Sequence, residues 1–234
     1  MGTNHRPKPW VLGLTGPSGS GKSTVCTLLR QGEMGSFLRF IDADQVSRQV
    51  VEPGLPCLRR LTQVFGEEIL LPDGHLDRRK LGGMVFGDPE KVELLNQTTL
   101  PFIVEEIRQQ IKAYALEDGV RGIILDAPTL FESGADKMCS QVASVLAPRE
   151  LRLERICQRD GISPEAAEKR LNSQHSDDFY RRRSRFVLTN GDSRERLEEE
   201  VCRMLRWLED IDRREYRSLR TRQRRRASLT QDRR

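Results

Sequence analysis

Residues 16–23 read Gly-Pro-Ser-Gly-Ser-Gly-Lys-Ser, and this stretch decides the fold. The apolar run Trp10–Thr15 that precedes it predicts a short buried strand of a parallel sheet. After it, Val25, Leu28 and Leu29 recur at helical spacing and predict a helix. Glycine permits the tight path on which successive N–H groups converge on an anion, and the positive end of the helix faces the same anion. The strand, turn and helix therefore predict a phosphate-binding loop.

Six residues of this loop are expected to bind the phosphates of ATP: Gly19, Ser20, Gly21, Lys22, Ser23 and Thr24. Lys22 should reach the β- and γ-phosphates, and the Ser23 hydroxyl should ligate Mg²⁺. The loop pattern alone also occurs in GTPases, motor ATPases and transporters. The chain has no Asn-Lys-x-Asp motif for reading guanine, and its 234 residues leave no room for a motor or transporter ATPase. A small kinase is therefore the favoured class.

Four further apolar runs predict strands, at residues 37–41, 120–126, 141–146 and 186–189. Helical patterns lie between them, at 45–51, over most of 55–118, at 150–159, and from the expected N-cap Ser163 onward. A last helix is expected from residue 192 or 193, with the apolar stripe Leu197, Val201, Met204, Leu205 and Leu208. This alternation predicts an α/β fold with a doubly wound, mostly parallel five-stranded sheet of the P-loop NTPase type.

The basic residues of the chain concentrate at its end. Residues 213–234 contain ten arginines and two acids, a net charge of +8, so the +5 of the whole chain leaves −3 on residues 1–212. We expect a kinase domain over 9–212 and a disordered tail over 213–234. Because arginine blocks bind nucleic acid, an ATP-regulated RNA-binding protein is an alternative interpretation. The tail has one aromatic residue, Tyr216, for stacking on bases, so the sequence disfavours a nucleic-acid partner.

The composition of the chain, together with the lack of a recognisable targeting segment, predicts a cytoplasmic protein. The chain is 36% hydrophobic and 32% charged, and it contains no apolar run near the roughly 20 residues that cross a membrane. Residues 1–9 are polar and offer no secretory segment. The five cysteines are scattered without metal or redox spacing, so we expect reduced thiols that pack as small hydrophobes.

An acidic segment, Asp42-Ala43-Asp44, ends the second predicted strand. In a doubly wound sheet an acceptor substrate would lie there, beside the γ-phosphate. Transfer to an alcohol needs a carboxylate that takes the hydroxyl proton, and Asp44 is our candidate for this base. Asp42 would support it or lie near the waters of Mg²⁺; alternatively, both acids only cap the next helix. Asp126, at the end of the third strand, is a candidate for holding Mg²⁺ through a water.

The segment 150–185 is rich in arginine, and most of these side chains are expected on solvated helix faces. One of them could close over the transferring phosphate as part of a lid. Arg159 is the candidate, because it precedes Asp160-Gly161, a turn suited to a hinge. The isolated His75 and His175 are given no ligand role.

With these pieces placed, the sequence resembles the dephospho-coenzyme A kinases over roughly residues 10–210. The matching stretches are Gly13–Gly16 with Gly19–Thr24; Ile41–Asp44 with Arg48 and Pro53-Gly54; Phe65-Gly66; Asp73-Gly74 with Leu76-Asp77-Arg78; Leu125–Glu132; and Arg155, Arg159–Gly161, Arg170, Gln174 and Leu188–Asn190. The joint occurrence of Asp-Ala-Asp and Asp-x-Pro-x-Leu-Phe-Glu is the specific part of the resemblance.

The resemblance implies ATP-dependent phosphorylation of the ribose 3′-hydroxyl of dephospho-coenzyme A, the last step of coenzyme A biosynthesis. It also implies that Asp44 is the general base, that the helical segment 55–118 binds the substrate, that 150–185 is a lid, and that Asn190 lies near the adenine of ATP. No membrane partner is implied, and a monomer is favoured. The resemblance leaves a kinase of another small alcohol or nucleoside as the alternative.

Two positions depart from the pattern of that family. Members often carry His-Pro where this chain has Leu100-Pro101, so no role is carried over to Leu100. Thr129 replaces an aliphatic residue, which we interpret as a change in packing.

Overall fold

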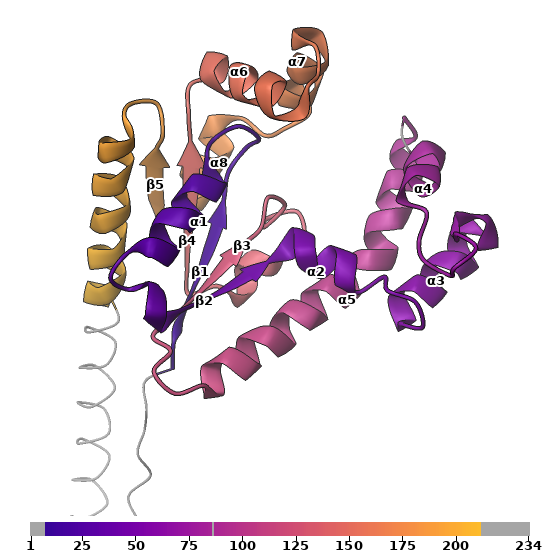
Figure 1. Cartoon of the computed structure of the whole chain (residues 1–234), viewed down its shortest axis with the longest axis horizontal. Coiled ribbons are helices and arrows are strands. Elements are labelled where there is room, and N and C mark those ends of the chain that lie inside the picture. The colour runs from indigo at the N-terminus through magenta and orange to yellow at the C-terminus, as the bar shows by residue number, and fades with distance from the viewer. Residues whose placement is uncertain (1–7, 86, 212–234) are drawn as a thin grey trace, which may run out of the picture. The chain divides into compact units, whose positions relative to one another are not determined.

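The computed structural model describes residues 8–85 and 87–211 and contains the expected five-stranded sheet. Its strands are β1 (Trp10–Thr15), β2 (Leu38–Asp42), β3 (Gly122–Asp126), β4 (Gln141–Leu146) and β5 (Phe186–Thr189). They follow the order β2-β3-β1-β4-β5, and the pairs β2–β3 and β4–β5 are parallel (Figure 1). The predicted doubly wound α/β fold is therefore confirmed, with all five strands at the expected places.

The helices group into one set around the first three strands and one set around the last two. The first set comprises α2 (Ala43–Gln49), α3 (Pro56–Phe65), α4 (Arg78–Val85) and α5 (Pro89–Leu116), with short 3-10 turns at Glu67–Ile69 and Ala135–Met138; a further 3-10 turn, Gly35–Phe37, precedes β2. The second set comprises α1 (Lys22–Gln31), α6 (Arg149–Asp160), α7 (Pro164–Asn172) and α8 (Asp177–Arg183), followed by a helix described over residues 194–211.

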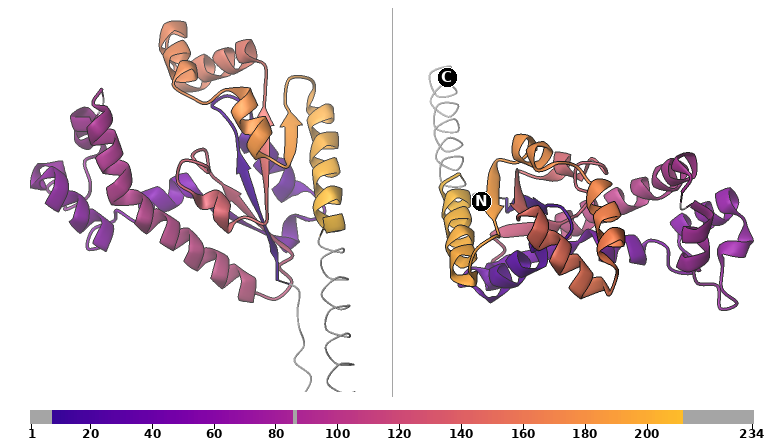
Figure 2. Two further views of the ribbon diagram at one scale, coloured as in Figure 1. Left: turned by 180° about the vertical axis from the view of Figure 1, so that it is seen from behind. Right: turned by 90° about the horizontal axis from the view of Figure 1, so that it is seen from above.

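The chain forms two compact units. Within the described part, the loop unit contains residues 8–10, 16–36 and 143–211, and the helical unit contains 11–15 and 37–142. The helical unit holds β1, β2 and β3, and its α2, α3 and α4 all pack against the long helix α5 (Figure 2).

The core of the helical unit is formed by apolar side chains of strands and helices together. Val11, Ile41 and Leu125 from the strands pack in one cluster with Leu61 and Ile107 from the helices, all of them buried. Burial of such side chains contributes about 1.5–3 kcal/mol each. The helical segment expected over 55–118 is thus a packed part of this unit.

Several predicted boundaries are shifted. Strand β2 spans 38–42 rather than 37–41, the third strand begins at Gly122 rather than at residue 120, and α2 spans 43–49 rather than 45–51. The early start of α2 has a clear cause, because the Asp42 carboxylate accepts hydrogen bonds from the backbone N–H groups of Asp44 (2.9 Å) and Gln45 (3.1 Å). Asp42 is therefore the N-cap of this helix.

In the loop unit, Ser163 caps α7 and Pro164 opens it, as predicted. Helix α7 packs on α6 through Ile156, Ala167 and Leu171, and the two helices lie side by side in Figure 1. Helix α8 was not predicted from the sequence.

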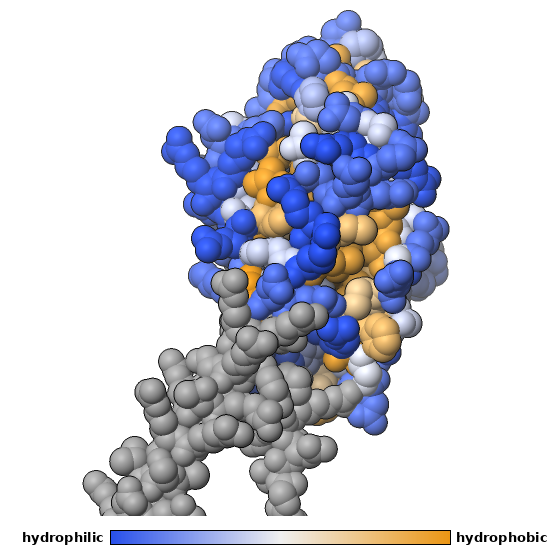
Figure 3. All heavy atoms as spheres, turned by 90° about the vertical axis from the view of Figure 1, so that its left-hand side faces the viewer, coloured by the Kyte–Doolittle hydropathy of each residue, from blue (hydrophilic) through white to orange (hydrophobic). Residues whose placement is uncertain are grey.

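The last helix has the expected apolar stripe. Leu197, Val201, Met204 and Leu208 are buried, and Leu205 is half-buried. The expected fading of the helix past residue 212 and the tail 213–234 lie outside the described residues. Figure 3 shows a mostly hydrophilic face with hydrophobic areas between the hydrophilic ones. None of the described helices is both long and apolar enough to cross a membrane.

Candidate active site

The phosphate-binding loop occupies residues 16–21, between β1 and α1. Gly19 and Gly21 have φ angles of 75° and 90°, in the left-handed region that favours glycine. A Cβ on Gly19 would meet the carbonyl oxygen of Arg152 at 2.7 Å, and one on Gly21 would meet Nδ2 of Asn190 at 1.9 Å. Both glycines are thus required by backbone conformation and by close packing.

Side chains from three other parts of the loop unit bind the backbone of this loop. Asn190, just after β5, donates from Nδ2 to the carbonyl oxygen of Ser20 at 2.9 Å. Arg155 on α6 donates from Nη1 to the carbonyl oxygens of Gly19 (3.2 Å) and Asn190 (3.3 Å). The backbone N–H of Ser18 donates to Oε1 of Gln174 at 3.1 Å. These bonds hold the loop in one conformation.

Arg152 is a further support of the loop that the sequence did not single out. Its side chain is buried, and its Nε donates to the carbonyl oxygen of Ser18 at 3.3 Å. Its Nη1 forms an ion pair with Asp177 of α8 at 3.0 Å. A buried guanidinium needs such partners, because an unpaired buried charge is costly. Helix α8 thus supplies the counter-charge of an arginine that holds the loop.

The residues of the loop fit the phosphates of a nucleotide. The hydroxyl oxygen of Ser20 is buried and is without a hydrogen-bond partner among the described residues. Buried hydroxyls are nearly always hydrogen-bonded, so this one is suited to a ligand oxygen. Lys22 and Ser23 stand in the first turn of α1, whose N-terminal end carries a partial positive charge. The predicted phosphate contacts therefore lie together in one loop.

Arg159 lies in the last turn of α6, where it is paired with its neighbour. Its Nε and Nη2 donate to the two carboxylate oxygens of Asp160 at 2.7 and 2.9 Å. Arg170 binds the same carboxylate, and hydrogen bonds from Arg159 and Arg170 lower the pKa of Asp160 to about 2. Gly161 ends the helix in the left-handed conformation, with a φ of 63°. The role predicted for Arg159 stays a prediction.

The three candidate carboxylates belong to the helical unit. Asp42 and Asp126 are in-register partners at the carboxyl ends of the adjacent parallel strands β2 and β3. Asp44 follows in the first turn of α2 and lines a cavity of about 450 Å³ with Ser47, Arg48 and Arg78. Asp42 thus has the capping function, and Asp44 borders this cavity.

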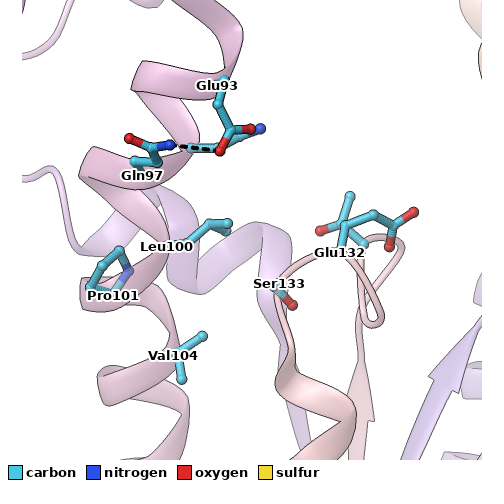
Figure 4. Close-up of a pocket in the computed structure, with 9 residues that line it drawn as sticks. Glu93, Gln97, Leu100, Pro101, Val104, Glu132 and Ser133 are labelled. Atoms are coloured by element: carbon cyan, nitrogen blue, oxygen red, sulfur yellow. Dashed lines mark hydrogen bonds between the residues drawn. The ribbon is translucent and has the colours of Figure 1, made fainter.

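A second cavity of the helical unit, of about 740 Å³, lies between α5 and the loop after β3 (Figure 4). Its lining consists of Glu93, Asn96, Gln97, Leu100, Pro101, Val104, Thr129, Glu132 and Ser133. Glu93 and Gln97 are joined by a hydrogen bond of 2.9 Å on the α5 side. Leu100 and Thr129, the two departures from the family pattern, both line this cavity. The replacement at Thr129 therefore changes the wall of a cavity and not only the packing of side chains.

The isolated histidines and the cysteines line neither of these two cavities. His75 is exposed and 3.2 Å from Asp73, and His175 stacks on Phe179 with ring centroids 3.7 Å apart. None of the five cysteines, all of them in the described residues, is in a disulfide, as expected, although Cys202 is exposed rather than packed. Burial raises the pKa of the Cys57 thiol to about 11 and that of Cys139 to about 12. Both thiols are therefore protonated and unreactive at neutral pH.

A parallel five-stranded sheet with a complete phosphate loop after its first strand, and carboxylates after the neighbouring strands, defines a P-loop kinase. A sequence model of the dephospho-CoA kinase family matches residues 10–195. The chain therefore belongs to the dephospho-CoA kinase family, and the expected membership is confirmed.

Individual relatives agree with this assignment. The chain is 36% identical to a dephospho-CoA kinase of Enterococcus faecalis, over 86% of this chain and 96% of the relative. It is 40% identical to that of Bdellovibrio bacteriovorus, over 86% of this chain and 97% of the relative. The crystal structure of TT1252 from Thermus thermophilus matches with a TM-score of 0.71 at 32% identity, over 86% of this chain and 98% of that one.

Proposed function

We propose that this protein transfers the γ-phosphoryl group of ATP to the ribose 3′-hydroxyl of dephospho-coenzyme A, giving coenzyme A and ADP. One observation carries the proposal. A complete phosphate loop and the Asp-Ala-Asp segment occur in a chain that spans 96–97% of the length of two relatives named for this kinase.

The loop unit binds the donor. The N–H groups around Gly19 and Gly21 bind the phosphates, and the Lys22 ammonium neutralises charge that develops on the β- and γ-phosphates. Asn190 already donates to the Ser20 carbonyl, and its assignment to the adenine end of the donor site comes from the family resemblance. Because the supporting side chains are in place, the loop needs little reorganisation when ATP binds.

The helical unit binds and activates the acceptor. The Asp44 carboxylate takes the proton of the 3′-hydroxyl as that oxygen attacks the γ-phosphorus, and the bond from this phosphorus to the β,γ-bridging oxygen breaks to release ADP. Asp42 acts through Asp44 as a positioning residue, since its carboxylate accepts the backbone N–H of Asp44 at 2.9 Å.

The residues present also fit a magnesium ion. The hydroxyl of Ser23 and the carboxylate of Asp126, the latter through a water, are oxygen donors of the type that Mg²⁺ prefers. When bound, Mg²⁺ neutralises phosphate charge. Arg159 can reach a phosphate only by leaving Asp160, and its exposed position at the end of α6 permits that exchange.

The remaining features of the proposal follow from the chemistry of the substrates. Both substrates are small, water-soluble molecules, and we expect the enzyme to act on them in the cytoplasm as a monomer. Sedimentation velocity of the purified full-length protein tests the oligomeric state, and a dimer at assay concentration would contradict this expectation.

The decisive experiment supplies the purified chain with Mg-ATP and dephospho-coenzyme A and follows ADP release, with phosphorus NMR to locate the new phosphate. A panel of nucleosides and small alcohols serves as the comparison. We expect turnover of dephospho-coenzyme A and a new 3′-phosphomonoester. Turnover of a nucleoside without turnover of dephospho-coenzyme A would overturn the proposal.

A further inference from the structure

Two arginines line the cavity that contains Asp44. Arg48 lies on α2, and Arg78 is the first residue of α4. Nη2 of Arg78 donates to the carbonyl oxygen of Arg48 at 3.4 Å, which brings the two helices together at this cavity. Both arginine side chains are exposed to solvent.

Neither guanidinium has a carboxylate partner within residues 8–85 and 87–211. The absence of a pair at Arg48 is informative, since it follows Asp44 by four residues on one helix, a spacing at which acid–base pairs commonly form. Two unpaired cations lining one cavity repel each other, and an anion between them removes that repulsion. Guanidinium groups are also the preferred ligands of phosphate oxygens.

The spacing on α2 suits the acceptor that we propose. Asp44 and Arg48 are one helical turn apart, about 6 Å along the axis. In dephospho-coenzyme A the 3′-hydroxyl and the 5′-diphosphate are attached to opposite sides of one ribose ring, a comparable span. A ribose whose 3′-hydroxyl lies at Asp44 can therefore place its diphosphate within reach of Arg48.

The other cavity of the helical unit has the opposite character. Glu93 and Glu132 are among the residues that line it, and no lysine or arginine is. Two carboxylates disfavour a diphosphate there. Within the helical unit, the cavity that holds the candidate base is lined by two arginines and one carboxylate, whereas the larger cavity is lined by two carboxylates and no basic side chain.

We propose that Arg48 and Arg78 bind the 5′-diphosphate of the acceptor and so make the enzyme select dephospho-coenzyme A over a nucleoside. This inference rests on the proposed function. It assigns the two arginines a part in acceptor specificity and no part in ATP binding.

The test compares Arg48→Gln, Arg78→Gln and the control Arg79→Gln, which alters the next residue of the same helix outside the cavity. Loss of a charged hydrogen bond costs about 1.5–3 kcal/mol, so KM for dephospho-coenzyme A should rise roughly 10- to 150-fold in the first two variants. KM for ATP should stay unchanged, and Arg79→Gln should behave like the wild type.

Adenosine, which lacks the diphosphate, provides the second measurement. Its inhibition constant against dephospho-coenzyme A, at saturating ATP, should be the same in all four proteins. An unchanged KM for dephospho-coenzyme A in the two variants would overturn the inference, and so would an equal weakening of adenosine.

Calorimetric binding of dephospho-coenzyme A separates this inference from the proposed function. If the wild type binds dephospho-coenzyme A without phosphorylating it, the proposed function fails, while loss of binding in Arg48→Gln and Arg78→Gln still supports the diphosphate site. If the wild type phosphorylates dephospho-coenzyme A and the two variants bind it normally, only the diphosphate site fails.

Discussion

The loop unit and the helical unit differ in the hydrogen bonds and ion pairs of the side chains that surround their candidate sites. In the loop unit, Asn190, Arg155 and Gln174 all make hydrogen bonds to the phosphate loop, and Arg152 is buried with Asp177 as its counter-ion. In the helical unit, exposed arginines line the Asp44 cavity without ion-pair partners in the described part of the chain.

This difference indicates two strategies of binding. A loop whose backbone bonds are complete is preorganised, so it pays little conformational entropy when the donor binds. A cavity lined by exposed arginines without ion-pair partners in the described residues gains its order from the ligand. Changes in the loop unit should therefore affect every acceptor alike, whereas changes in the helical unit should depend on which acceptor is used.

The largest effect is expected for Asp44→Asn in the helical unit. Loss of a general base should lower kcat by about 10²–10⁴-fold and leave ATP binding nearly intact. Steady-state kinetics and ATP calorimetry measure both. Asp42→Asn is the matched control, because asparagine is as good an N-cap as aspartate and should retain most of the turnover. Strong loss of ATP binding in Asp44→Asn would instead mark Asp44 as a metal or nucleotide ligand.

The second-largest effect is expected for Lys22→Ala in the loop unit. The lost electrostatic stabilisation of the transferring phosphoryl group should lower kcat about 10²–10³-fold, even at saturating ATP. Because Lys22 belongs to the loop unit, which binds the donor, kcat should fall by the same factor whichever acceptor is supplied. Turnover at the wild-type level would refute the assignment of the phosphate loop.

Asn190→Ala should have a smaller effect, confined to the donor. It removes the bond to the Ser20 carbonyl at the loop and leaves that buried oxygen unsatisfied. A cost of about 1–2 kcal/mol corresponds to a KM for ATP raised roughly 5- to 30-fold. KM for dephospho-coenzyme A should not change, and Thr189→Ala, at the exposed neighbouring position, should be silent. A change in the acceptor KM alone would contradict preorganisation of the loop.

The smallest effect concerns the exposed ion pair at the end of α6. The pKa of Asp160 is lowered to about 2 by Arg159 and Arg170, below the unfolded value of about 3.9. Its contribution to stability is therefore complete above about pH 5 and is lost as the pH falls toward 2. Chemical denaturation should show Asp160→Asn slightly less stable than the wild type at pH 7 and nearly equal at the acid end. A difference independent of pH would show that the carboxylate charge is not responsible.

Local features of the sequence were sufficient for much of this protein. The loop over 16–23 depends on glycine conformation and on the strand and helix that flank it, all of which are encoded within about twenty consecutive residues. The five strands could be predicted for a similar reason, because buried parallel strands are rich in consecutive apolar residues. The family could be inferred because its motifs are short, continuous stretches of sequence.

Helix α8 has a start signal in the sequence although its pattern did not predict a helix. Ser176 followed by Asp177 and Asp178 is a typical helix start, and Ser176 does cap α8 through the N–H of Phe179 at 3.4 Å. Helix α8 has seven residues, three of them arginine, and is too short for a clear apolar periodicity. The alternative interpretation of Asp-Ala-Asp, in which both acids cap the next helix, holds for Asp42, whereas Asp44 borders a cavity.

What the sequence by itself determined is the fold class, the phosphate loop and the identity of Asp44 as the acid to examine. The tertiary structure alone decided which distant side chains meet: Arg152 with Ser18, 134 positions away, Asn190 with Ser20, 170 positions away, and Arg78 with Arg48. It also brought Leu100 and Thr129 to one cavity. The physical reason is that a motif reports local backbone geometry, whereas charge pairing and cavity lining arise from packing between elements far apart in the chain.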